Sequence, residues 1–182
     1  MTFEALALQG HKTTYESLAA SIGPRIRDLR KAAIKESFYG FQHAEHRLET
    51  VAVIRDMEFI NDSRSSTMNA TWFALESVSR PIIWIVGGVD PGNDYTVLRQ
   101  LVRTKVKGII SLGKDNARIR EAFGELEIPF KEASTMEEAV ESAYYMGKNG
   151  YTVLLSPACP SFDLFENFEE RGMAFRKAVK NL

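Results

Sequence analysis

Seven consecutive polar residues, 61–67, carry side chains that suit a phosphorylated ligand, and they read Asn-Asp-Ser-Arg-Ser-Ser-Thr. The Asp62 carboxylate can accept hydrogen bonds from ribose hydroxyls, and the Arg64 guanidinium can bind a carboxylate or a phosphate through two parallel hydrogen bonds. The serines can cap a following helix and donate to an anion. Capping needs one or two such residues, so we interpret the segment as a binding loop, with a plain capping loop as the alternative.

A second candidate is residues 156–172, where small residues and two prolines follow an apolar run at 151–155. Each proline fixes φ and moves the residue before it away from helical geometry, so we expect an extended chain there. Ser161 or Asp163 is then expected to cap a helix that begins near Leu164. A strand end, a turn and a helix N-terminus leave backbone N–H groups that suit an anion.

Two shorter segments are weaker candidates. Arg47 precedes the first expected strand and could stack on a base or reach a phosphate, whereas His46 beside it is more often a structural or surface residue. Residues 87–94 begin with two glycines, which allow a ligand to approach the backbone closely. They match neither the dinucleotide fingerprint nor the phosphate-binding loop, so alone they indicate an ordinary strand-to-helix turn.

Composition argues against several classes of protein. The net charge of −1 gives no broad surface for nucleic acid or membrane, and 45% hydrophobic residues are ordinary for a globular protein. The single cysteine, Cys159, excludes an intrachain disulfide and fits a reducing compartment, and we interpret it as a packed small residue. Three histidines and one cysteine show no metal-ligand spacing. With no apolar run of about 20 residues and no signal-peptide pattern, the sequence predicts a cytoplasmic protein.

The elements that must position these residues alternate between strand and helix from about residue 46. Apolar runs indicate strands, and apolar residues at helical spacing indicate helices. The expected strands cover residues 48–54, 57–60, 82–86, 106–111, 128–131 and 151–155. The expected helices cover residues 66–78, 95–105, 115–123 and 135–147, and a closing helix from about residue 164. Thr135 and Glu138 have the spacing of a capping box.

This alternation predicts an α/β fold, a Rossmann-like three-layer domain with a mostly parallel sheet. Ligands of such sheets bind outside the carboxyl ends of the strands. Three loops are expected to converge there, at residues 61–67, 87–94 and 156–161. A short helical segment precedes the domain, because residues 1–44 carry two expected helices separated by Gly23-Pro24.

Together these segments resemble the C-terminal domain of the Mur ligases, most closely in the members that add D-glutamate. The resemblance rests on His46-Arg47-x-Glu49, on Phe59-Ile-Asn-Asp-Ser63, on Val86-Gly-Gly88, and on residues 156–172, with Ser-Pro-Ala-Cys-x-Ser-x-Asp followed by Phe-x-Asn-Phe-x-x-Arg-Gly. It covers residues 45–182. Residues 1–44 resemble the end of the family's central ATPase domain plus a linker.

The resemblance implies an ATP-dependent ligase of peptidoglycan synthesis that joins D-glutamate to UDP-N-acetylmuramoyl-L-alanine through an acyl phosphate. It implies that ATP and Mg are bound mainly by domains outside this chain, and that this domain closes over the nucleotide held by the central ATPase domain. We therefore expect the chain alone to be inactive. No nucleic-acid or membrane partner is implied.

The resemblance also implies roles for individual residues. Those implied to contact the nucleotide are Arg47 and Asp62, the catalytic residue is Arg64, and those implied to bind the substrate are Ser66, Ser161, Phe162 and Phe168. Phe168 also lies on the apolar stripe of its expected helix, so packing is an equal explanation for that residue.

The sequence departs from the family pattern at three places, one of which is Arg64, where the family has a lysine. Lys12-Thr13 and Glu16 stand where the family has His-Asn and a later Asn, and Pro91 stands where the D-glutamate-adding members commonly have a lysine. These changes leave open a different class of function, a degenerate stand-alone binding module without catalysis. Another amide ligase, such as a folate polyglutamate synthetase, is a third reading, and residues 156–172 argue against it.

Overall fold

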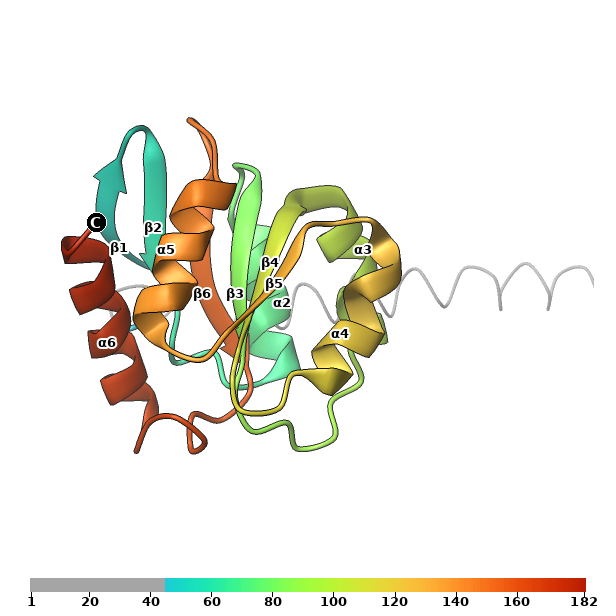
Figure 1. Cartoon of the computed structure of the whole chain (residues 1–182). Coiled ribbons are helices and arrows are strands. Elements are labelled where there is room, and N and C mark those ends of the chain that lie inside the picture. The colour runs from blue at the N-terminus through green and yellow to red at the C-terminus, as the bar shows by residue number, and fades with distance from the viewer. Residues whose placement is uncertain (1–44) are drawn as a thin grey trace, which may run out of the picture. The chain divides into compact units, whose positions relative to one another are not determined.

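The computed structural model describes residues 45–182, and the helices expected within residues 1–44 lie outside the described residues (Figure 1). The described strands are β1 (Glu49–Ile54), β2 (Met57–Asn61), β3 (Ile82–Gly87), β4 (Val106–Leu112), β5 (Phe130–Ala133) and β6 (Thr152–Ala158). The described helices are α2 (Met68–Ser77), α3 (Thr96–Lys105), α4 (Ala117–Phe123), α5 (Met136–Met146) and α6 (Phe168–Lys180), with a short 3-10 helix, η1 (Gly124–Leu126), after α4.

The six strands form one sheet in the order β1-β2-β6-β3-β4-β5. β1 pairs with β2 in antiparallel fashion, and the other neighbouring strands are parallel. The last strand, β6, lies between β2 and β3, so the chain changes direction across the sheet at that point. The predicted α/β fold with a mostly parallel sheet is confirmed, and ligands of such sheets bind at the change of direction.

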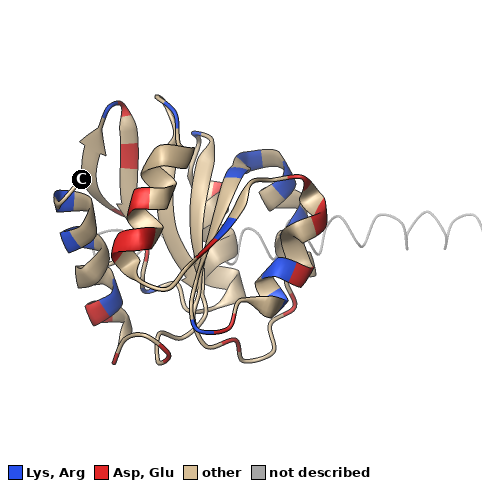
Figure 2. Ribbon diagram, in the orientation of Figure 1, with Lys and Arg blue, Asp and Glu red and all other residues tan. Residues whose placement is uncertain are grey.

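Helices cover both faces of the sheet and make the predicted three layers. One buried cluster packs α5 and α6 against the sheet, and a second packs α2, α3 and α4 against the opposite face. In the view of Figure 1, α5 lies in front of the sheet and α2 behind it. Figure 2 shows no charged residue on the central strands β3 and β6, whose residues are all buried. Strands covered on both faces are expected to be apolar along their whole length.

Local sequence explains most of the element boundaries. Arg55 and Asp56 adopt positive φ values of 49° and 58° in the tight turn between β1 and β2, as a two-residue hairpin of this type requires. Thr135 caps α5 by accepting from the Glu138 N–H at 3.2 Å, and the Glu138 carboxylate accepts from the Ser134 N–H at 3.0 Å. The predicted capping of this helix is confirmed.

The predicted start of the closing helix was wrong by about four residues. α6 begins at Phe168, and its N-cap is Asn167, whose side chain accepts from the Glu170 N–H at 2.7 Å. Neither Ser161 nor Asp163 caps a helix. The Ser161 carbonyl accepts from the N–H groups of Leu164 and Phe165, which makes a separate turn before the helix begins. Asparagine is as good an N-cap as serine or aspartate, so the later position was equally suited.

Candidate functional site

Neighbouring strands end side by side, and their loops form one polar edge at the bottom of Figure 1. We name three of them the β2 loop (residues 61–67), the β3 loop (residues 88–95) and the β6 loop (residues 158–167). The Ala158 N–H donates to the Ser65 carbonyl at 3.0 Å, and the Val89 N–H donates to the Pro160 carbonyl at 2.9 Å. The predicted convergence of these loops is therefore confirmed.

A fourth loop joins the edge, and the sequence did not reveal it. The Lys114 N–H, after β4, donates to the Asp163 carboxylate at 3.1 Å. The close approach of the β3 and β6 loops depends on glycine at position 88, which has a φ of 128°. A Cβ there would collide with the Pro160 carbonyl and lie 3.2 Å from the Cys159 Cβ. Gly88 therefore serves both backbone conformation and packing.

Asp62, predicted to contact the nucleotide, lies inside the fold with 1% of its surface exposed. Its two carboxylate oxygens accept from the Leu48 N–H at 3.2 Å and from the Ser156 hydroxyl at 2.8 Å. Burial raises the pKa of Asp62 to about 6, against the opposing effect of hydrogen bonds from Ser65 and Ser156. The carboxylate thus holds the start of β1 and the end of β6 together, and its contact with a nucleotide stays a prediction.

Arg47 lies close enough to this carboxylate for their charges to interact, and Arg64 in turn interacts with Arg47. Arg47 is half-buried, and its pKa is lowered by burial and by the charge of Arg64, while Asp62 raises it. Arg64 is exposed, and its guanidinium carbon lies 5.6 Å from the centre of the Phe168 ring. The structure therefore brings together the residues predicted to bind nucleotide and the one predicted to be catalytic.

The three residues predicted to shape the substrate pocket lie in different surroundings. Ser161 is 2% exposed, Phe168 is half-buried beneath Arg64, and Phe162 is 72% exposed. Phe168 belongs to α6, which also contacts Ser66 through Arg171 at 3.2 Å. The structure thus groups Phe168 with Arg64 and Ser66, whereas no hydrogen bond or ring contact joins Phe162 to them within residues 45–182.

Arg171 is the functional candidate that the sequence analysis missed. It is 2% exposed, and its guanidinium donates to the Ser63 carbonyl at 2.8 Å, the Ser63 hydroxyl at 3.0 Å and the Cys159 carbonyl at 2.9 Å. Burial lowers the pKa of Arg171 to about 10, which still leaves it a cation at neutral pH. A signal was present, because Arg171 lies one helical turn before Phe175 on the apolar stripe of its helix.

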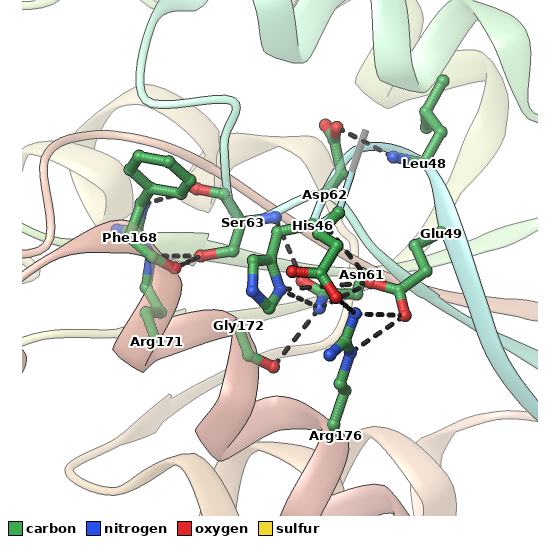
Figure 3. Close-up of polar contacts among 11 residues, drawn as sticks. His46, Leu48, Glu49, Asn61, Asp62, Ser63, Phe168, Arg171, Gly172 and Arg176 are labelled. Atoms are coloured by element: carbon green, nitrogen blue, oxygen red, sulfur yellow. Dashed lines mark hydrogen bonds and ion pairs between the residues drawn. The ribbon is translucent and has the colours of Figure 1, made fainter. Parts of the chain in front are cut away.

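A second buried polar network, shown in Figure 3, holds the β2 loop against α6. His46 is 3% exposed, and its Nδ1 lies 2.8 Å from the Asn61 side-chain nitrogen, which also donates to the Gly172 carbonyl at 3.2 Å. Arg176 of α6 pairs with Glu49 of β1 at 2.7 Å. A Cβ at Gly172 would collide with the His46 ring. The structure thus agrees with the interpretation of His46 as a structural residue.

Besides its bonds to the β6 loop, the β3 loop has short-range bonds of its own. The Asp90 carboxylate accepts from the N–H groups of Gly92 at 2.8 Å and Asn93 at 2.7 Å. The Arg118 guanidinium, from α4, donates to the Asn93 carbonyl at 3.0 Å and lies 3.5 Å from Asp90. Pro91 is exposed at the tip of this loop. Arg118 of α4 thus brings a positive charge to this loop, whereas Pro91 within the loop has no charge.

Cys159 is fully buried, and its sulfur lies 3.4 Å from the Asn93 side-chain nitrogen. Burial raises the pKa of its thiol, which favours the unreactive protonated form and fits a packed residue.

Residues 45–182 contain no group of three or more His, Cys, Asp or Glu side chains placed to hold a metal ion. Among those same residues, no helix has the length and apolar content needed to cross a membrane.

Comparison with curated proteins identifies relatives along the whole chain. It is 49% identical over 182 residues to the UDP-N-acetylmuramoylalanine–D-glutamate ligase of Christiangramia forsetii. It is 45% identical over 183 residues to the ligase of the same name from Bacteroides fragilis, and 43% identical over 182 residues to that from Salinibacter ruber. Each alignment covers 100% of this chain but 40–41% of the relative, so the chain spans about two fifths of their length.

Two solved structures share the fold of this chain. A murein peptide ligase, Mpl, from Psychrobacter arcticus aligns with a TM-score of 0.50 and 14% identity over 76% of this chain and 30% of its own. MurF from Acinetobacter baumannii aligns with a TM-score of 0.50 and 16% identity over 74% of this chain and 31% of its own. At these identities the likeness shows the fold alone. No family model matches the chain.

Proposed function

Because the chain is a homologue of the Mur ligases over its whole length, we propose that it is the amino-acid-binding domain of an ATP-dependent ligase of peptidoglycan synthesis. The enzyme would add D-glutamate to UDP-N-acetylmuramoyl-L-alanine. The observation that carries this proposal is the 43–49% identity to curated ligases of that name. The polar edge where the loops converge supports it, because sheets of this type bind ligands there.

The proposed domain covers residues 45–182, with residues 1–44 as the end of the central ATPase domain plus a linker. The chain covers about two fifths of its relatives, so we expect activity to require the remaining part of the enzyme. Nucleotide-linked substrates and ATP are cytoplasmic compounds, which supports a cytoplasmic location. The central ATPase domain is the proposed protein partner.

The proposed reaction has two steps. A carboxylate oxygen of UDP-N-acetylmuramoyl-L-alanine takes the γ-phosphoryl group of ATP, which leaves ADP and an acyl phosphate. The amino nitrogen of D-glutamate then attacks the acyl carbon, loses a proton and expels phosphate through a tetrahedral intermediate. Arg64 suits the neutralisation of charge on the transferred phosphoryl group, because its guanidinium is exposed at the rim and held over Phe168.

The remaining site residues fit a division of the edge between two ligands. Arg47 is proposed to reach the nucleotide phosphates from beside Asp62, and Asp62 to face the ribose. Ser66, Ser161, Phe162 and Phe168 are proposed to line the D-glutamate pocket. Within residues 45–182 no acidic cluster could hold a metal, so we propose that Mg and the ATP phosphates are held mainly by the central domain.

A degenerate binding module is the second candidate, and the exposed Pro91 in the β3 loop favours it. The two candidates differ in what precedes Met1 in the genome. An in-frame ATPase domain with a Gly-Lys-Thr loop would support the ligase, whereas a translation start at Met1 would support the binding module.

The activity test compares the protein carrying any upstream domain with the 182-residue chain alone. We expect the longer protein to incorporate labelled D-glutamate into UDP-N-acetylmuramoyl-L-alanine with stoichiometric release of phosphate, and the chain alone to be inactive. Arg64→Ala should lower kcat on the order of 100-fold, as the loss of a transition-state cation does. Arg103→Ala, which removes an exposed arginine of α3, should leave kcat unchanged. Absence of ligation by the longer protein would refute the proposal.

A further inference from the structure

We propose that Arg171 is a positioning residue that makes the Ser66 hydroxyl an outward hydrogen-bond donor to a carboxylate of the amino-acid substrate. The inference deepens the proposed function and rests on it. It assigns a role to a buried cation that the residues predicted from sequence do not include.

The starting observation is that the Arg171 charge is buried without an ion pair. Its surface is 2% exposed, and it forms no salt bridge with a carboxylate in the described part of the chain. Four neutral oxygens accept its hydrogen bonds instead: two carbonyls, of Ser63 and Cys159, and two hydroxyls, of Ser63 and Ser66. Burial lowers the pKa of Arg171, and the charges of nearby groups, Asp163 and Asp62 among them, offset this effect only in part. A cation buried without a direct ion pair is costly, which points to a use that compensates for the cost.

The two hydroxyls bound to Arg171 differ in the acceptors to which they donate hydrogen bonds. The Ser63 hydroxyl accepts from Arg171 Nε at 3.0 Å and donates to the Phe168 carbonyl at 2.7 Å, so its hydrogen bonds are made within the fold. The Ser66 hydroxyl accepts from Arg171 Nη2 at 3.2 Å and donates to no acceptor among residues 45–182. Ser63 is fully buried, while Ser66 is half-buried at the polar edge.

This arrangement sets the direction of the Ser66 hydroxyl. A hydroxyl that already accepts from a cation presents its proton to the next acceptor, and the two bonds strengthen each other. The next acceptor is expected to be an anion, because the exposed guanidinium of Arg64 lies two residues away. A carboxylate at this place would accept a hydrogen bond from the Ser66 hydroxyl. It would also be attracted by the positive charges of Arg171 and Arg64.

The chemistry of the proposed substrate fits this description. D-glutamate is a dicarboxylate, so it can offer a carboxylate to the Ser66 hydroxyl. Arg171 acts through Ser66 and does not need to touch the substrate, which agrees with its 2% exposure. The role therefore predicts a coupled effect of the two residues on amino-acid binding and no effect on the binding of ATP.

The test uses steady-state kinetics of the ligase that carries this chain, with Ser66→Ala, Ser63→Ala, Arg171→Met and the double variant of Ser66 and Arg171. Ser66→Ala should raise the KM for D-glutamate on the order of 10- to 100-fold, the effect of losing a charge-assisted hydrogen bond, and leave the KM for ATP unchanged. Ser66→Thr keeps a hydroxyl and should restore most of the binding. Arg171→Met combined with Ser66→Ala should be no worse than the larger single effect.

Ser63→Ala is the matched control, since it removes the other hydroxyl bound by Arg171. It should lower the unfolding temperature while the KM for D-glutamate stays within about twofold of wild type. If Ser63→Ala and Ser66→Ala raise this KM equally, or if the Arg171 and Ser66 effects multiply, the inference is overturned. The Ser63 and Ser66 comparison remains decisive if Arg171→Met does not fold. An inactive wild-type ligase would instead overturn the proposed function, and this inference with it.

Discussion

The β2 loop and the β3 loop follow the two strands that flank β6, but they are held in place in different ways. Asn61, Asp62 and Ser63 of the β2 loop are at most 1% exposed. Residues of α6, more than 100 positions away in sequence, bond to Asn61 and Ser63, and Ser156 of β6 bonds to Asp62. The β3 loop exposes Val89 and Pro91 at its tip, where the loop's own Asp90 accepts two hydrogen bonds, and its ends bond to the β6 loop through the Val89 N–H and the Asn93 side chain.

The difference indicates a division of labour at the polar edge. A loop whose backbone and side chains bond to a distant helix keeps one geometry, which suits groups that must be positioned for chemistry. The exposed tip of a loop, shaped by its own turn, can shift at a lower cost than a buried loop, even where the ends of that loop are bonded to a neighbour. We therefore expect the β2 loop to fix Arg64 and Ser66, and the β3 loop to adapt to the ligand.

The largest expected effect comes from disturbing the anchor of the β2 loop at Gly172. Gly172→Ala places a methyl group against the buried His46 ring, which bonds to Asn61. We expect the free energy of unfolding, measured in urea, to fall by about 3 kcal/mol, because overpacking forces the ring or the helix to move.

The control for this substitution is Gly124→Ala. No atom lies within 4 Å of a Cβ built at Gly124, and its φ of −60° suits alanine. This variant should be neutral or more stable by up to about 1 kcal/mol. Equal stability of the two variants would show that the β2 loop is not fixed through Gly172, and the contrast between the loops would lose its basis.

A smaller effect is expected from the titration of Asp62. The pKa of Asp62 is about 6 in the fold and 3.8 in its absence, so the folded state binds the proton more tightly. The stability contributed by this proton is fully present below pH 3.8 and is lost as pH rises through about 6. Between about pH 7.5 and pH 5, wild type should gain on the order of 1 kcal/mol relative to Asp62→Asn, which does not titrate.

Urea unfolding of both proteins at each pH measures this gain. The comparison with Asp62→Asn removes the contributions of other titrating groups, because these are shared. Stabilities of wild type and variant that change in parallel with pH would mean that Asp62 is not buried as described. In that case the Asp62 carboxylate would be exposed to water, like the tip of the β3 loop.

Much of this architecture could be predicted from sequence because its signals are local. The apolar run of β3 and the capping box at Thr135 each lie within a few residues, and both predictions were confirmed. The start of α6 was missed because Ser161, Asp163 and Asn167 are equally good caps, and a turn bound to the Ser161 carbonyl decides between them.

The site was predicted less completely, for a physical reason. A polar loop after a strand shows which side chains are available, and Arg64 and Ser66 became candidates in this way. It does not show which polar groups are satisfied inside the fold. Asp62 and Arg171 are buried by partners 94 and 108 residues distant, and no periodic pattern in the sequence reports such pairings.

The smallest expected effect tests the adaptable side of the comparison at Arg118. Its guanidinium is half-exposed and lies 3.5 Å from Asp90, so Arg118→Ala should lower the unfolding free energy by about 0.5 kcal/mol at low salt and by less at high salt. Arg120→Ala is the matched control. Arg120 lies on the same helix as Arg118, α4, and it forms an exposed ion pair with Glu132 of β5, away from the β3 loop. Similar small losses in urea unfolding are expected for both. A loss above about 2 kcal/mol in Arg118→Ala alone would mean that the β3 loop is anchored as firmly as the β2 loop.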